Sequence, residues 1–135
     1  MTSRAEIEKI IRDAYAARAR NDVEGTFAAF HPDCDFRLNG RGTGAAAMNQ
    51  PFRGQAAVRQ AIGSLIAAFR FEDWKLIDLI VEGDLAAVHW RAKVTCNATG
   101  RFDEFDVIDK CRLKDGKVIE FLQSYDSALA KKISA

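Results

Sequence analysis

The sequence lacks the features that mark several large functional classes. It carries 20 basic and 19 acidic residues for a net charge of +1, so no overall field attracts nucleic acid. Its first residues alternate charged with apolar side chains, unlike a secretory signal. No later segment approaches the roughly 18 consecutive apolar residues that cross a bilayer. We therefore expect a cytoplasmic protein with no nucleic-acid or membrane partner.

Cysteine and histidine are also scarce, with three and two residues respectively. Cys34, Cys96 and Cys111 lie far apart in apolar contexts, as expected of small buried side chains in a reducing compartment. His31 and His89 fall on separate predicted elements without an acidic cluster at ligand spacing. No serine stands in a nucleophile-elbow context either. We expect no metal and no cofactor.

What the sequence does contain is enough apolar material for one core. A chain of 135 residues that is 48% hydrophobic, without a linker or an internal repeat, predicts one domain over residues 1–135. Helical periodicity predicts helices at residues 3–20, 22–31 and 55–69. Period-two alternation predicts strands at residues 35–39, 74–81, 85–96, 102–113 and 118–126. Helices first and long strands last indicate an α+β fold, with helices on one face of an antiparallel sheet.

Local signals support particular parts of this assignment. Ser3 followed by Glu6 resembles a capping box at the start of the first helix. The Asp115-Gly116 dipeptide predicts a hairpin between the last two strands. The apolar face of the first helix is predicted to carry Ile7, Ile10, Ile11, Ala14, Tyr15 and Arg18.

Three glycines, Gly40, Gly42 and Gly44, follow the first predicted strand and are typical of a turn-rich segment. Their spacing is not that of a phosphate-binding loop, and no Gly-Lys-Ser or Gly-Lys-Thr follows them. We interpret this segment as a flap over a pocket.

Asp109 is the most informative single residue. In the strand 102–113 it shares a face with four side chains of apolar character, so alternation places an acid where an apolar residue is expected. Burying an ionised carboxylate without a partner costs several kcal/mol. Such an acid must be paired, hydrogen-bonded or protonated. It is either a pocket acid or a structural acid paired with Arg91 or Arg112.

The last predicted strand offers a second acid. If Leu122 faces inward, Ser124 and Asp126 follow it into the same interior as Asp109. Trp90, on the apolar face of the strand 85–96, would form a wall beside the two acids. The alternative is that Asp126 caps a short helix that begins after the strand.

The opposite face of the predicted strand 118–126 would carry Ile119, Phe121 and Tyr125. Such an apolar surface is unfavourable on a monomer, because it would remain in contact with water. We therefore predict a homodimer formed through the sheet.

Two passages resemble the SnoaL-like and ketosteroid-isomerase-like proteins of the nuclear transport factor 2 superfamily. They are Asn-Asp-Val-Glu-Gly-Thr-Phe-Ala-Ala-Phe-His-Pro-Asp at residues 21–33, and Asp-Val-Ile-Asp at residues 106–109 with the hairpin that follows. The resemblance covers nearly the whole chain. It implies a cystatin-like/SnoaL-like α+β barrel, in which a cone-shaped curved antiparallel sheet wraps around three helices of the N-terminal half. This fold hosts isomerases, dehydratases, cyclases, epoxide hydrolases and binding modules, so it does not identify a substrate.

By this resemblance, the sequence has one of the three catalytic groups of ketosteroid isomerases. Asp109 matches the carboxylic acid that an apolar site keeps neutral, so that it donates a hydrogen bond to the developing oxyanion. Tyr15 lies one position from the tyrosine of that site, and Ala14 takes the matching place. The proton-shuttling aspartate would lie near Leu38 or Asn39, and neither side chain can abstract a proton. We do not expect ketosteroid isomerase activity.

We expect the protein to bind a small, largely apolar, oxygen-bearing organic molecule in an enclosed pocket. Asp109 and Asp126, one ionised and one protonated, would perform cofactor-free acid–base chemistry of an isomerase, cyclase, dehydratase or epoxide-hydrolase type. Two aspartates with a nearby arginine also resemble the epoxide hydrolases of the superfamily. The alternative is a non-catalytic ligand-binding or dimerisation module of the same fold. The predicted ligand-binding residues are Tyr15, Phe27, Phe30, Leu38, Phe52, Phe69, Trp90 and Ser124.

Overall fold

The computed structural model describes residues 2–38 and 51–135, and the predicted flap at Gly40 to Gly44 lies outside them. The prediction of helices in the N-terminal half and long strands in the C-terminal half is confirmed, with one additional helix at the end. In chain order the elements are α1 (Arg4–Ala19), α2 (Val23–Phe27), β1 (Phe30–Leu38), β2 (Phe52–Arg53), α3 (Gln55–Ala68), β3 (Phe69–Glu82), β4 (Leu85–Cys96), β5 (Phe102–Lys114), β6 (Lys117–Ser124) and α4 (Ser127–Ser134).

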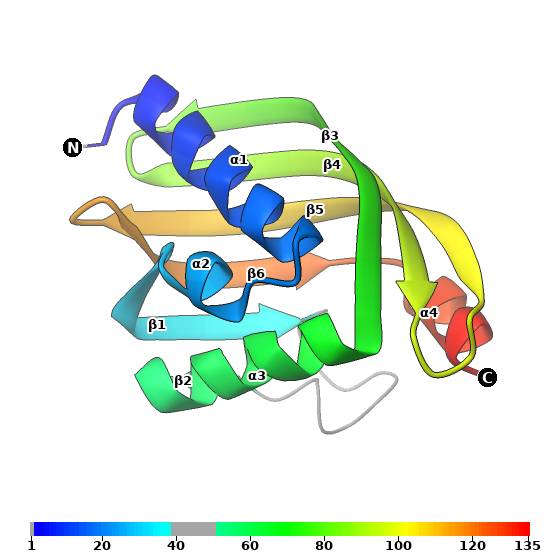
Figure 1. Ribbon diagram of the computed structural model, residues 1–135. Coiled ribbons are helices and arrows are strands. Elements are labelled where there is room, and N and C mark those ends of the chain that lie inside the picture. The colour runs from blue at the N-terminus through cyan, green and yellow to red at the C-terminus, as the bar shows by residue number, and fades with distance from the viewer. Residues whose placement is uncertain (1, 39–50) are drawn as a thin grey trace.

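The strands form one curved, unclosed sheet of six strands in the order β2-β1-β6-β5-β4-β3. Figure 1 shows α1 and α2 lying over one face of this sheet, with α3 along its β1 side. The strand β3 begins directly after α3 and bends where its pairing with β4 shifts between Glu72 and Lys75. Asp73 has a φ of 55° at this irregularity. A bulge of this kind bends a strand, and here it curves the sheet around the helices.

The pairing of β1 with β6 is parallel, whereas an antiparallel sheet was predicted. The other strand pairs are antiparallel, as predicted. A parallel pair needs a long connection between its strands. Here the whole segment from β2 to β5 separates β1 from β6 along the chain.

The second helix is shorter than predicted, since it ends at Phe27 instead of near His31. The β1 strand starts at Phe30 and contains Pro32, which has no N–H to donate to a ladder. Its pairing with β6 is irregular between Phe30 and Asp35. The proline is therefore accommodated within an irregular part of the strand.

The Asp115-Gly116 turn is confirmed as the hairpin between β5 and β6. Asp115 has a φ of 54° and Gly116 a φ of 74°, the left-handed conformations that a type I′ turn requires at both central positions. This turn matches the right-handed twist of the two strands that it joins.

A β-bulge follows this hairpin and decides which residues of β6 face the interior. Leu113 pairs with Val118, but the preceding Arg112 pairs with Glu120, so Ile119 is an extra residue in β6. An extra residue moves every later side chain of the strand to the opposite face. The inward direction predicted for Leu122 and the residues after it is therefore wrong.

The core lies between the inner face of the sheet and the helices. It contains the inward residues of α1 and α3 together with alternate residues of β4 and β5, among them Ile7, Ile62, Val88, Ala92 and Val107. No helix within the described ranges is long and apolar enough to cross a membrane.

Candidate functional site

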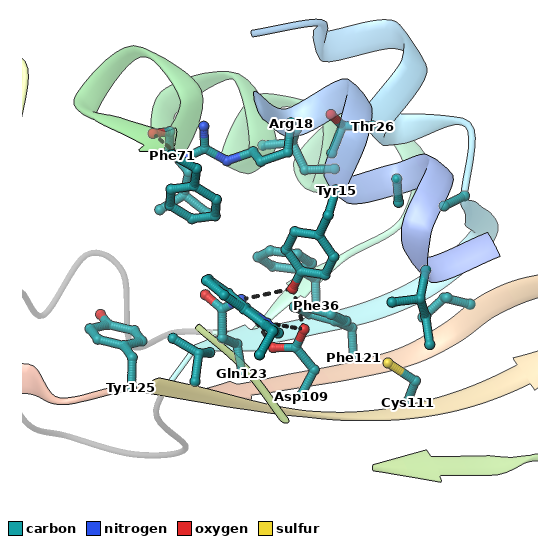
Figure 2. Close-up of a pocket in the computed structure, with 18 of the residues that line it drawn as sticks. Tyr15, Arg18, Thr26, Phe36, Phe71, Asp109, Cys111, Phe121, Gln123 and Tyr125 are labelled. Atoms are coloured by element: carbon teal, nitrogen blue, oxygen red, sulfur yellow. Dashed lines mark hydrogen bonds between the residues drawn. The ribbon is translucent and has the colours of Figure 1, made fainter. Parts of the chain in front are cut away.

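An apolar cavity of about 140 Å³ lies between the helices and the inner face of the sheet. For comparison, an engineered cavity of about 150 Å³ in another protein binds benzene. The wall is formed mainly by aliphatic and aromatic side chains from all the long elements. Its polar members are few, and they include Tyr15, Arg18, Asp109, Gln123 and Tyr125 (Figure 2). Such a cavity suits a small, largely apolar ligand with a few polar groups.

Asp109 is buried in this wall, with 1% of its surface exposed. The Tyr15 hydroxyl and the Trp90 indole N–H both donate to its Oδ2, the latter over 2.9 Å. The Gln123 side-chain amide donates to Oδ1 over 3.1 Å (Figure 2). The three donors come from α1, β4 and β6, so the tertiary fold itself assembles the surroundings of this carboxylate. The alternative interpretation of Asp109 as a partner of Arg91 or Arg112 is wrong, because those arginines contact acids of the outer face.

Burial dominates the electrostatics of Asp109. Loss of water raises its pKa from 3.8 to about 6, and the hydrogen bonds from Tyr15, Gln123 and Trp90 limit that rise. Burial and the neighbouring Asp109 raise the pKa of Tyr15 well above its usual value, so its hydroxyl keeps its proton. At neutral pH the pair is thus a carboxylate held by a neutral phenol. A carboxylate with a pKa near 6 can both accept and return a proton at physiological pH.

Aromatic packing fixes the direction of Tyr15. Its ring stacks on Trp74 at a centroid distance of 5.0 Å and contacts Trp90 at 4.9 Å. Although Ala14 takes the position that the ketosteroid isomerase resemblance assigns to tyrosine, the Tyr15 hydroxyl reaches Asp109. A tyrosine and an acid therefore meet in this cavity despite the one-residue offset in the sequence.

Asp126 does not enter the cavity, and the prediction that it points into the same interior as Asp109 is wrong. Its side chain is exposed and accepts a hydrogen bond from the Leu129 backbone N–H over 2.9 Å, as the N-cap of α4. The alternative interpretation as a helix cap is confirmed. Ser124 is exposed as well, because the bulge at Ile119 directs Gln123 inward instead.

The structure brings four of the eight predicted ligand-binding residues to the cavity wall, namely Tyr15, Phe30, Phe69 and Trp90. The other four do not line it. Leu38 is buried in the core, and Phe27 and Phe52 pack against that core from partly exposed positions. Whether the lining residues bind a ligand stays a prediction.

Arg18 and Gln123 line the cavity but were not among the predicted site residues. Arg18 is 6% exposed, donates from Nη2 to the carbonyls of Leu65 and Phe69 over 3.0 and 2.7 Å, and lies 3.9 Å from the centre of the Phe71 ring. Burial lowers its pKa to about 10, which leaves it positively charged at neutral pH. The sequence did contain a signal for Arg18, because a charged residue on the apolar face of a helix is as unexpected as Asp109 on the apolar face of a strand. Gln123 had no such signal, because the bulge hides its direction.

Within the described ranges, no group of three His, Cys, Asp or Glu side chains is arranged to hold a metal ion. Cys34, Cys96 and Cys111 are buried and free. Cys111 lines the cavity, and burial together with Asp109 raises the pKa of its thiol, so it remains a neutral wall residue.

Comparison with known proteins places these features in context. The family model for the SnoaL-like domain matches residues 11–121. Among solved structures, an NTF2-like protein from Burkholderia xenovorans LB400 is 19% identical, with a TM-score of 0.79 and 100% of each chain covered. An LEH-like epoxide hydrolase from M. tuberculosis is 14% identical, with a TM-score of 0.72 over 96% of this chain and 90% of that one.

TerC, crystallised with polyporic acid, is 21% identical, with a TM-score of 0.76 over 95% of this chain and 96% of that one. At these identities the likeness concerns the fold alone. No curated protein matches the sequence.

Proposed function

The chain belongs to the SnoaL-like domain family, and from this premise we propose that it binds a small, largely apolar, oxygen-bearing molecule and moves a proton with Asp109. One observation carries the proposal: Asp109, a buried carboxylate held by three donors, stands in a cavity wall that is mostly apolar. Perturbed acids in such cavities are typical of acid–base sites. Two neighbours of the same fold are an LEH-like epoxide hydrolase and TerC, which was crystallised with polyporic acid, and both agree with small-molecule binding.

The proposed reaction is proton transfer at a carbon next to a carbonyl group. Asp109 in its ionised form accepts the proton, the C–H electron pair moves into the carbonyl group, and an enolate forms. Asp109 then returns the proton to the same or another carbon of the ligand, which regenerates the carboxylate. Tyr15, Trp90 and Gln123 hold the carboxylate in place, and positioned proton transfer of this kind typically accelerates a reaction by about 10²–10⁴-fold. The step needs no cofactor.

A single carboxylate takes the place of the two that were expected to share the chemistry. The expected partner of Asp109 was Asp126, which caps α4 at the surface. Asp109 therefore acts in both forms. It is ionised when it accepts the proton and protonated when it returns the proton. Its pKa of about 6 suits both stages near neutral pH.

Deuterium exchange of cyclohexanone in D₂O tests the proposal, since this ketone is close in size to the cavity. We expect the wild-type protein to catalyse exchange at the carbons next to the carbonyl, and the rate to rise with pH through about 6 and then level. Asp109→Asn should reduce the protein-catalysed rate by about 100-fold or more. The matched control is Asp126→Asn, which changes an exposed acid and preserves a good helix cap.

Exchange that is equally fast with Asp109→Asn as with the wild type would contradict the role of Asp109. An equal loss in Asp126→Asn would show that the effect does not belong to the cavity. Proton NMR follows both reactions directly in one sample.

The second candidate is a non-catalytic binding module of the same fold. One observation favours it: both carboxylate oxygens of Asp109 already accept hydrogen bonds from side chains. A fully bonded acid of this kind can serve a structural role. Saturable binding of cyclohexanone without any exchange above the buffer rate would support this candidate over the enzyme.

We also propose a homodimer through the outer face of the sheet, on different residues from those first expected. Phe121 and Tyr125 line the cavity, so they do not form an outer apolar surface. Ile80 and Ile108 support the proposal, because they are 67% and 46% exposed on the face away from the cavity. Light scattering should give about twice the 15.0 kDa chain mass, and Ile80→Asp should lower it. A wild-type mass near 15.0 kDa at micromolar concentration would refute the dimer.

A cytoplasmic location remains part of the proposal. It is supported by the three cysteines, which are all buried and unpaired. Free thiols of this kind persist in a reducing compartment. Fractionation of cells that produce the protein would test the location.

A further inference from the structure

Arg18 is a buried cation without an acidic partner in the described part of the chain. Its side chain is 6% exposed, and the ion pairs of the described residues all involve other side chains. A charge removed from water is stabilised when an opposite charge lies beside it, and an uncompensated one is costly. The structure therefore places a positive charge in the cavity wall, and none of the described residues supplies its counter-ion.

The contacts that Arg18 makes within the protein do not compensate its positive charge. Nη2 donates to the carbonyl oxygens of Leu65 and Phe69, and the guanidinium lies over the Phe71 ring. These neutral contacts tie α1 to the junction of α3 and β3. The remaining Nη1 is buried and has no hydrogen-bond partner among the described residues. A buried donor without an acceptor is unfavourable, so the Arg18 side chain has an unmet need for an acceptor oxygen.

Asp109 does not serve as the missing counter-ion. Its oxygens accept hydrogen bonds from the side chains of Tyr15, Trp90 and Gln123. Figure 2 shows Arg18 beside Phe71 on one side of the site and Asp109 on the other, with Tyr15 between them. The cavity thus has a cationic end and an acidic end, joined by apolar walls.

We propose that the natural ligand is a small carboxylate whose carboxylate group binds Arg18 while its apolar body occupies the cavity toward Asp109. The ligand supplies both things that Arg18 lacks among the described residues, a negative charge and an acceptor oxygen for Nη1, and a hydrogen bond between two charged groups is stronger than one between neutral groups. The cavity volume of about 140 Å³ limits the apolar body to about the size of one six-membered ring. This inference depends on the proposed function only for the location of the binding site, and not for the proton transfer.

Two pairs of probes test the proposal, benzoate with benzamide and crotonate with crotonamide. The members of each pair have nearly the same shape and differ in charge. Titrations of ¹⁵N-labelled protein, followed by NMR, give the dissociation constants. We expect the wild type to bind each carboxylate at least about tenfold more tightly than its amide, as charge-assisted hydrogen bonds predict.

Two variants identify the residue responsible. Arg18→Met keeps an unbranched apolar stem without the charge, and it should bind acid and amide within about twofold of each other while amide affinity is retained. Arg18→Lys keeps a positive charge, and it should preserve a preference for the acid. If Arg18→Met does not fold, the acid and amide affinities of the wild type and of Arg18→Lys still decide the question. A wild type that binds acid and amide equally is sufficient to reject the proposal.

Three results would overturn the inference: equal binding of acid and amide by the wild type, an undiminished acid preference in folded Arg18→Met, or no binding of any probe. Asp109→Asn separates this inference from the proposed function. The acid preference should persist in Asp109→Asn even though deuterium exchange is lost. Conversely, a wild type that prefers carboxylates but catalyses no exchange would support the Arg18 site and reject the proton transfer.

Discussion

Replacing Asp109 with asparagine should remove a cost that its ionisation imposes on the folded state at neutral and basic pH. Burial raises the pKa of Asp109 from 3.8 to about 6, so the folded protein binds a proton more tightly than the unfolded chain does. Below pH 3.8 the acid is protonated in both states and contributes nothing to this difference. As the pH rises toward 6, the unfolded chain releases the proton first, and the free energy of unfolding falls. Above pH 6 the full cost is present.

The size of this cost follows from the two pKa values. Their difference, about 6 − 3.8, or about 2 pH units, corresponds to about 3 kcal/mol at 1.36 kcal/mol per unit. Asparagine carries no charge at any pH, so it removes this contribution. The asparagine carbonyl can accept hydrogen bonds from Tyr15 and Trp90. Its NH₂ group, however, would face the NH₂ group of Gln123, and since both are donors the Gln123 amide must rotate to present its oxygen. That rearrangement adds an offset that does not change with pH.

Urea denaturation of both proteins at pH values from 4 to 8 isolates the effect. The free energy of unfolding of Asp109→Asn minus that of the wild type should increase by about 2–3 kcal/mol from pH 4 to pH 8, with most of the change below about pH 6. Other titrating groups are common to both proteins and cancel in the difference. A difference that stays constant over this range, or that falls as pH rises, would refute the assignment of a raised pKa to Asp109.

Two further predictions concern neighbours of this acid and its expected partner. Tyr15→Phe removes a hydrogen bond to the carboxylate, so the pKa of Asp109 should rise further, and ¹³C NMR of the carboxyl carbon should detect it; an unchanged or lower pKa would contradict the bond. Asp126→Ala should lower the free energy of unfolding by about 0.5–2 kcal/mol through loss of the α4 cap, while ketone exchange continues. Loss of exchange in a folded Asp126→Ala would place that residue back in the chemistry.

Much of the fold could be predicted because its signals are local. The β4 strand covers Leu85–Cys96, the same range that alternation indicated, and the Asp115-Gly116 turn appears between β5 and β6 as expected. The parallel pairing of β1 with β6 and the early start of β3 could not be predicted in this way. They depend on contacts between segments far apart in the chain, which leave no local pattern.

Some residues of the candidate site could likewise be predicted from local patterns, and others could not. Local pattern is enough to place Asp109 on a buried face, because alternation runs through β5 without interruption. Helical periodicity likewise places Tyr15 on the inward side of the first helix. That Gln123 completes the site while Asp126 caps a helix depends instead on how the strands pair. The extra residue Ile119 forms a bulge only when β6 pairs with β5, and this bulge reverses the direction of every later side chain in the strand.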